Sequence, residues 1–142
     1  MSRRMVWGPT FEEMLHPDKI DPAIRAEALA AKESDPLNEI SLYNITWKRP
    51  DGKPCYIVLP KELTGVDANI IALYGRDFPT GSHKVGATYT VTMEKQLLGE
   101  ITPGEHTLVY PSTGNYGIGG AWVGPRMGYD SVVILPELMS AE

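Results

Sequence analysis

Residues 106–135 read HTLVYPSTGNYGIGGAWVGPRMGYDSVVIL, and this stretch decides the fold. Short apolar runs stand at its two ends, over residues 106–110 and 131–135. Between them come a polar loop at 111–115 and a glycine-rich segment of helical length at 116–123. Two five-residue apolar strands joined by a helix are typical of a parallel sheet that is buried on both faces. The stretch therefore predicts a strand–helix–strand unit.

The same alternation extends upstream. We expect a strand at 69–74, a polar loop at 75–82, and a helix at 84–98 that Gly99 ends. Together these elements predict an α/β fold of three layers, in which a parallel sheet of three strands is covered by helices on both faces. The chain stops a few residues into a further helix that begins at Pro136, which would leave one edge and one face of the sheet open. We therefore expect an incomplete domain, either a fragment or one polypeptide of a divided protein.

The N-terminal part of the chain, residues 1–65, predicts an extension that carries a helix and a β-hairpin. The helix is expected over the alanine-rich residues 23–32, because an Asp-Pro pair that suits a helix start comes directly before them. The hairpin would join strands at 40–47 and 55–59 through a Pro-Asp-Gly turn. Residues 66–142 then hold the alternating strands and helices of the main domain.

Composition excludes several classes of function. The 142 residues include 13 Lys and Arg against 18 Asp and Glu, so the net charge is −5. An acidic chain without a basic run argues against nucleic acid or an anionic membrane as the main partner. The apolar runs are too short to span a bilayer, and the N-terminus lacks the apolar segment of a secretion signal. The single cysteine, Cys55, forms no internal disulfide, which suits a reducing compartment. We expect a cytoplasmic protein.

The first loop that is a candidate for catalysis reads PTGSHKVG, over residues 79–86. It places Lys84 in the first turn of a helix, where the partial positive charge of the helix N-terminus disfavours the ammonium form. A lysine that deprotonates readily is what Schiff-base chemistry requires. A surface lysine beside a serine cap explains the same residues, and it is the commoner situation for this loop alone.

The second loop is followed by a helix that is unusually rich in glycine. Backbone N–H groups from Ser112 to Asn115 at a helix start form a natural anion site. Four glycines follow, at positions 117, 119, 120 and 124. They lower helix stability by about 3–4 kcal/mol in total. These glycines therefore allow either a ligand or another part of the protein to approach the helix backbone closely. The sequence favours neither of these two explanations.

The familiar nucleotide and metal fingerprints are absent. A dinucleotide pattern would need glycine at position 122, where Trp122 stands, and a P-loop would need a different pair after Gly81 than Ser82-His83. No G-x-S-x-G elbow is present. The histidines and the cysteine show no metal-ligand spacing, so no metal site is expected.

Taken together, the two loops resemble the fold-type II family of pyridoxal-phosphate enzymes, which includes cysteine synthase, threonine synthase, serine/threonine dehydratases and the tryptophan synthase β subunit. The similarity covers residues 68–137 and lies in the order of two motifs. TGSHK at 80–84 looks like the lysine loop, and its His-Lys pair is most like that of tryptophan synthase β chains. STGN at 112–115 looks like the substrate loop of the cysteine synthase branch. The resemblance implies pyridoxal 5'-phosphate as the cofactor.

The resemblance also implies a role for each residue of the two motifs. Lys84 would be the catalytic residue that forms the internal aldimine, and His83 would lie near the cofactor phosphate. Asn115 would bond the phenolic oxygen of the cofactor. The substrate carboxylate would be held by the second loop, that is by Ser112, Thr113, Gly114 and Asn115.

The implied reaction is β-elimination or β-replacement on serine, O-activated serine, cysteine or threonine, through an external aldimine and an aminoacrylate. Residues 112–115 contain no acid, unlike tryptophan synthase β chains, so indole condensation is not expected. The family's second phosphate loop and its partner for the pyridine nitrogen lie outside these 142 residues, so we expect a second polypeptide that completes the fold. N-terminal extensions in the family often pack on the partner subunit, so a homodimer is the other expectation. The alternatives are a non-catalytic α/β module that binds phosphate or carboxylate, and an inactive fragment of a split enzyme.

Overall fold

The computed structural model describes residues 7–49 and 51–138. Its elements, with α for helices, η for 3₁₀ helices and β for strands, are α1 (Phe11–Leu15), η1 (Pro17–Lys19), α2 (Pro22–Ser34), η2 (Glu39–Asn44), β1 (Tyr56–Leu59), α3 (Lys61–Thr64), β2 (Ile70–Leu73), α4 (Lys84–Leu97), β3 (Thr107–Pro111), α5 (Asn115–Arg126) and β4 (Asp130–Ile134). The chain is of mixed α/β type, as predicted.

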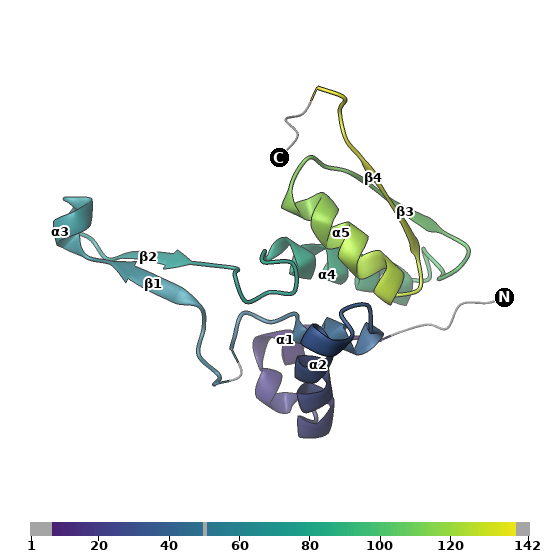
Figure 1. Ribbon diagram of the computed structural model, residues 1–142, viewed down its shortest axis with the longest axis horizontal. Coiled ribbons are helices and arrows are strands. Elements are labelled where there is room, and N and C mark those ends of the chain that lie inside the picture. Colours follow the sequence, from purple (N-terminus) through teal and green to yellow (C-terminus); the bar gives the residue numbers. More distant parts are fainter. Residues whose placement is uncertain (1–6, 50, 139–142) are drawn as a thin grey trace.

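The strand–helix–strand unit predicted at the C-terminal end is confirmed. Strands β3 and β4 pair in parallel, with Thr107 opposite Asp130 and Pro111 opposite Ile134. Helix α5 connects them and covers one face of the pair, and α4 packs against α5 (Figure 1). Helix α4 begins at Lys84, as predicted, and Gly99 follows its end with a φ of +71°, a conformation that suits glycine.

The hydrophobic core joins the N-terminal part of the chain to this unit. Its buried members are Met14, Leu42, Ile45, Phe78, Val85, Tyr89, Val123, Met127 and Tyr129. Two buried hydroxyls find acceptors across the core: Tyr89 Oη donates to the Pro9 carbonyl at 2.8 Å, and Tyr129 Oη donates to Gln96 Oε1 at 2.7 Å. The proposed division at residue 65 stays a prediction, although residues on both sides of it share this core.

The prediction of three parallel strands is wrong for the described part of the chain. Strand β2 pairs in antiparallel fashion with β1, from Ile70 opposite Leu59 to Leu73 opposite Tyr56, and it belongs to a separate two-stranded sheet. This pair, with α3 at its tip, projects away from the remaining elements (Figure 1). Strand β1 satisfies the backbone of β2 through the connection at residues 60–69, which contains α3, whereas a parallel partner would require a crossover through the whole of α4.

The strand expected at 40–47, and with it the hairpin to 55–59, is also wrong. Residues 39–44 form the 3₁₀ helix η2, whose start is capped where the Asn38 side chain accepts a bond from the Ile40 N–H at 2.9 Å. Asn44 then donates through Nδ2 to the Ala28 carbonyl of α2 at 2.6 Å. The side-chain bonds of these two asparagines favour helix over strand. Near the expected turn, the described residues keep a β-bridge between Lys48 and Pro54 and a hydrogen bond from the Arg49 N–H to the Lys53 carbonyl at 3.0 Å.

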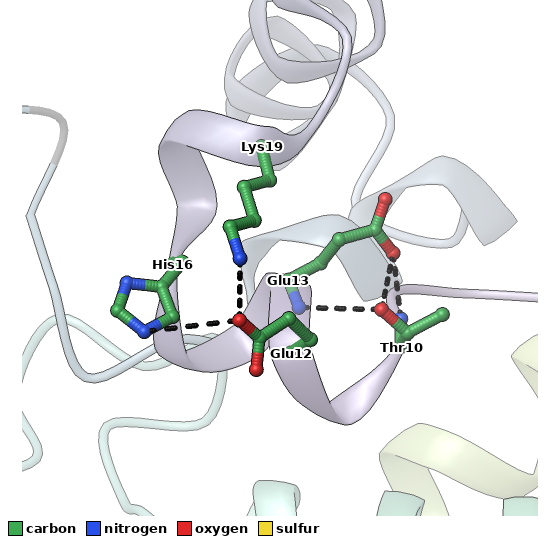
Figure 2. Close-up of polar contacts among 5 residues, drawn as sticks. All are labelled: Thr10, Glu12, Glu13, His16 and Lys19. Atoms are coloured by element: carbon green, nitrogen blue, oxygen red, sulfur yellow. Dashed lines mark hydrogen bonds and ion pairs between the residues drawn. The ribbon is translucent and has the colours of Figure 1, made fainter.

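The helices at the N-terminus are fixed by their caps. In α1, Thr10 and Glu13 form a capping box: the Glu13 N–H donates to Thr10 Oγ1 at 3.2 Å, and the Glu13 carboxylate accepts from the Thr10 N–H at 2.8 Å (Figure 2). Glu12, on the same helix, pairs with Lys19 at 2.5 Å and with His16 at 4.0 Å (Figure 2). Helix α2 starts as predicted, with the Asp21 side chain accepting from the Ala23 N–H.

The three-layer arrangement is not reached in the described residues. Side chains alternate along β3 and β4, so those facing away from α5 include Val109, Val132 and Ile134. These three are 53%, 47% and 54% exposed. The helix expected from Pro136 does not form at 136–138, and its remaining residues lie outside the described part. Among the described helices, none combines the length and apolar character that crossing a membrane would require.

Candidate active site

The two loops singled out in the sequence lead into helices that touch each other. Lys84 is the first residue of α4, and Asn115 is the first residue of α5. A Cβ placed on Gly119 would lie 3.1 Å from both the carbonyl carbon and the carbonyl oxygen of Lys84. Gly119 follows Asn115 by one helical turn, which is about 5–6 Å along the axis. The structure therefore brings the starts of the two helices side by side.

The glycines of α5 all face neighbouring protein. A Cβ at Gly117 would approach the Ser112 carbonyl and Val133 Cγ1 at 2.9 Å, and one at Gly120 would lie 2.5 Å from the Tyr110 ring. A Cβ at position 124 would overlap the hydroxyl of a β4 serine. Of the two explanations left open by the sequence, close packing is the one that these contacts support. The packing at Gly119 in turn sets the distance between the two loops.

The lysine loop is held by contacts within itself and from α4. Ser82 is buried, and its Oγ accepts a bond from the Lys84 N–H at 3.3 Å. One turn later, Thr88 Oγ1 donates to the Lys84 carbonyl at 3.2 Å. Gly75, two residues after the end of β2, lies so close that a Cβ there would be 2.8 Å from the His83 backbone nitrogen. The backbone of Lys84 is therefore well fixed, while its side chain is exposed.

Gly75 is a site residue that sequence reasoning missed. The available signal was a glycine at the end of an apolar strand, where a close approach of backbone to backbone is common.

His83 has an aromatic neighbour that the sequence did not indicate. Its imidazole stacks on the Trp47 indole, with ring centroids 5.5 Å apart and an interplanar angle of 27°. Trp47 in turn meets Phe78 edge to face at 4.9 Å. The three rings line an apolar groove beside Gly86 of α4. The role of His83 beside a cofactor phosphate stays a prediction.

The second loop lies at the carboxyl ends of the two parallel strands. A hollow there is lined by Pro111, Ser112 and Thr113 from β3 and its loop, and by residues 134–136 at and after the end of β4. Open parallel sheets bind their ligands at this edge. Around Gly114 there is free space, since nothing lies within 4 Å of a Cβ built on it. Ser112 and Thr113 line this hollow, whereas Lys84 and Asn115 do not.

The start of α5 keeps donors available for an anion. In the described part of the chain, the N–H groups of Asn115 and Tyr116 have no hydrogen-bond acceptor, as is usual in the first turn of a helix. The Gly117 N–H, by contrast, donates to the Gly114 carbonyl at 2.9 Å. Ser112 Oγ accepts a long bond of 3.4 Å from the Gly114 N–H, which folds the loop back on itself. Free backbone donors and the hydroxyl of the exposed Thr113 suit a carboxylate or a phosphate.

Comparison with known proteins gives partial matches. No family model matches the chain. It is 39% identical over 84 residues to cystathionine beta-synthase of Saccharomyces cerevisiae, which is 59% of this chain and 16% of that protein. It is 41% identical over 64 residues to cysteine synthase of Staphylococcus aureus, which is 45% of this chain and 20% of that protein. It is 31% identical over 91 residues to cysteine synthase 3 of Caenorhabditis elegans, which is 64% of this chain and 27% of that protein.

These matches cover more than half of this chain in two cases but at most about a quarter of any of the three relatives. Cystathionine beta-synthase and the cysteine synthases are pyridoxal-phosphate enzymes of fold type II. The resemblance inferred from the two loops is therefore confirmed at the level of homology. Over the matched stretch, this chain is similar to cystathionine beta-synthase and to cysteine synthases, which are fold-type II pyridoxal-phosphate enzymes.

Proposed function

We propose that this chain carries the cofactor-linking lysine and the substrate-carboxylate loop of a pyridoxal-phosphate enzyme. The reaction would be β-elimination or β-replacement on serine, O-activated serine, cysteine or threonine. The single observation that supports this most is the contact between Gly119 and the Lys84 backbone, because it sets the two motif loops side by side. Similarity to cystathionine beta-synthase and to cysteine synthases agrees with this substrate class.

The residues present fit the cofactor in their chemistry. Lys84 offers an exposed primary amine, and Asn115 offers an exposed amide at the start of the neighbouring helix. Free N–H groups at Asn115 and Tyr116 suit a negatively charged group. The Lys84 amine and the Asn115 amide would match the aldehyde and the phenolic oxygen of the cofactor, and the free N–H groups would match the substrate carboxylate.

A small number of side chains would take part in the proposed reaction. When bound, pyridoxal phosphate would supply an aldehyde that joins amines and a ring that accepts electrons from the substrate carbon. Ser112, Thr113 and Asn115, with the backbone of Gly114, would bind and orient the substrate carboxylate. Nζ of Lys84, when not joined to the cofactor, would take the proton from the substrate Cα and return it later.

The complete assembly is also part of the proposal. The face of β3 and β4 opposite α5 exposes Val109, Val132 and Ile134. A further layer of helix there would give the three-layer arrangement and would bury these side chains, which favours it by about 25 cal/mol per Å² of apolar surface. A second copy of the chain or a second polypeptide would supply it, and the domain begins at residue 66 in this proposal.

The proposal is tested by adding pyridoxal phosphate to the purified protein and recording its visible absorption. We expect a band that borohydride reduction fixes to the protein, and peptide mass mapping should place the adduct on Lys84. A Lys84→Ala variant should lose the band completely. Lys95→Ala is the matched control, because Lys95 lies on the same helix and pairs with Glu100 at the far end, at 2.7 Å.

Two results would contradict the proposal. One is a band that survives in the Lys84→Ala variant with its absorbance unchanged, and the other is a reduced adduct that maps to a different lysine. In either case the amine at the start of α4 is not the attachment point, and the non-catalytic binding module becomes the better description.

A further inference from the structure

Two adjoining hollows lie between α2 and the segment that follows η2. Arg25 of α2 lines both of them, together with Lys48 and Arg49. Lys32 and Asp77 line the first hollow as well. None of these residues belongs to the two motif loops proposed to bind cofactor and substrate. We call the set Arg25, Lys32, Lys48 and Arg49 the basic pocket.

The positive charge of the basic pocket is only partly compensated, although Asp77 lines the first hollow and Asp18 lines the second. Arg25 Nη1 donates to the Tyr43 carbonyl at 3.0 Å, and Lys32 Nζ donates to the Asp77 carbonyl at 3.3 Å, so both cations contact neutral oxygens. Arg49 is 3.5 Å from the carboxylate of Asp51. Within residues 7–49 and 51–138, Lys48 has no carboxylate partner. Four cations in one place are unusual in a chain whose net charge is −5.

Two further observations indicate a missing negative partner. Arg49 Nε is buried and has no hydrogen-bond acceptor among the described residues, although buried N–H groups are nearly always paired. Burial also lowers the pKa of Arg25, which means that its charged form is held in a setting that disfavours it. An anion in the hollow would offset the positive charge of the Arg49 guanidinium and the loss of hydration around Arg25.

The shape of the donor set favours phosphate over other anions. Two guanidinium groups present planar forks that match phosphate oxygens, and two ammonium groups add point charge. Leu29 and Phe78 line the first hollow beside the cations, so an apolar part of a ligand would have a surface to contact. A dianionic group with a small organic body matches this combination.

We propose that the basic pocket binds a small phosphate-bearing molecule, whose phosphate lies among Arg25, Lys48 and Arg49 and whose body rests against Leu29 and Phe78. This site is separate from the proposed cofactor site, because it lies on α2 and the segment at 46–49, whereas the cofactor would be held at the starts of α4 and α5.

The experiment uses inorganic phosphate as the probe and isothermal titration calorimetry as the readout, on protein freed of pyridoxal phosphate. Ionic strength is kept constant with potassium chloride. We expect saturable binding to the native protein, at least tenfold weaker binding to a Lys48→Gln/Arg49→Gln variant, and unchanged binding to Lys95→Gln. Since Arg49 is partly buried, Lys32→Gln at an exposed position serves as a second variant, with binding weakened several-fold and folding checked by circular dichroism.

Each other outcome would overturn the proposal. If titration with phosphate gives no more heat than titration with chloride, the protein has no phosphate site here. If the double variant binds phosphate as tightly as the native protein, the phosphate site lies elsewhere. Acetate binding as tight as phosphate would change the ligand class to carboxylates. A Lys84→Ala variant should still bind phosphate, so loss of binding there would assign the phosphate to the lysine loop, whereas failure of the cofactor test alone leaves the basic pocket in place.

Discussion

The β1–β2 arm and the β3–α5–β4 unit use similar strands in opposite ways. Both contain short runs of Ile, Val and Leu, yet Ile57 and Ile71 of the arm are 51% and 59% exposed, whereas Tyr110 of β3 is 6% exposed. In the unit, α5 lies across the strand pair, while the arm extends away from the other elements without a covering helix (Figure 1). Apolar strands therefore form a core in this protein only where a helix approaches closely enough to cover them.

The glycines of α5 make that approach possible. Gly120 leaves room for the Tyr110 ring, and Gly119 lets the helix lie against the backbone of Lys84 on its other side. Each glycine weakens the helix by about 0.8–1.0 kcal/mol relative to alanine. Packing on both sides of α5 compensates for this loss, and the arm has no comparable contact.

The largest expected effect comes from filling one of these spaces. Gly120→Ala should destabilise the protein by about 1–3 kcal/mol in spite of alanine's better helix propensity, because its Cβ would lie 2.5 Å from the Tyr110 ring, and Gly120→Val should cost more. Urea unfolding followed by circular dichroism measures the change.

Gly86→Ala in α4 is the matched control for that measurement. A Cβ at Gly86 would meet Ile45 Cγ2 at 3.5 Å, an ordinary contact, so this variant should be more stable by about 0.5–1 kcal/mol. If both alanine variants change stability in the same direction, then close packing is not what the α5 glycines provide.

A smaller effect is expected at the base of the arm, where the buried Cys55 thiol donates to Asp77 Oδ2 at 2.9 Å. Burial, and then the hydrogen bond and charge of Asp77, raise the pKa of Cys55. The folded state therefore favours the neutral thiol. This contribution to stability is complete below the pKa of the thiol in the unfolded chain, which is about 8.5. It is lost as the pH rises through the higher pKa of the thiol in the folded protein.

Asp77→Asn should shift the pH profile of Cys55 alkylation by iodoacetamide to lower pH, because it removes a carboxylate that opposes thiolate formation. Asp67→Asn, which changes a carboxylate on the arm that pairs with Lys61, is the control and should leave the profile unchanged. An unchanged profile in Asp77→Asn would show that burial alone sets the thiol pKa.

The smallest effect is expected on the arm itself. Ile71→Thr keeps a β-branched side chain on an exposed strand, so the free energy of unfolding should change by no more than about 0.5 kcal/mol. Thermal and urea unfolding measure it. A loss above about 1.5 kcal/mol would mean that a partner covers the arm in solution, and the contrast with the β3–α5–β4 unit would then disappear.

Local signals predicted the C-terminal unit well. The start of α4 at Lys84 and the positions of β3, α5 and β4 came within about one to three residues of the observed bounds, because caps, glycine and short apolar runs act over a few residues. The same reasoning failed for residues 40–47, where Asn38 and Asn44 bond to the backbone and stabilise η2. The alternation of apolar residues alone did not distinguish a strand from a 3₁₀ helix at these positions.

By itself, the sequence determined the two motif loops and their order, since a lysine at the start of one helix and a polar loop before the next are local features. Only the tertiary structure decided the antiparallel pairing of β2, the stacking of His83 on Trp47, the packing of Gly119 against Lys84 and the gathering of four cations from α2 and residues 48–49. Each of these joins segments that are distant along the chain, and their contacts depend on side-chain shape and burial, which no local pattern encodes.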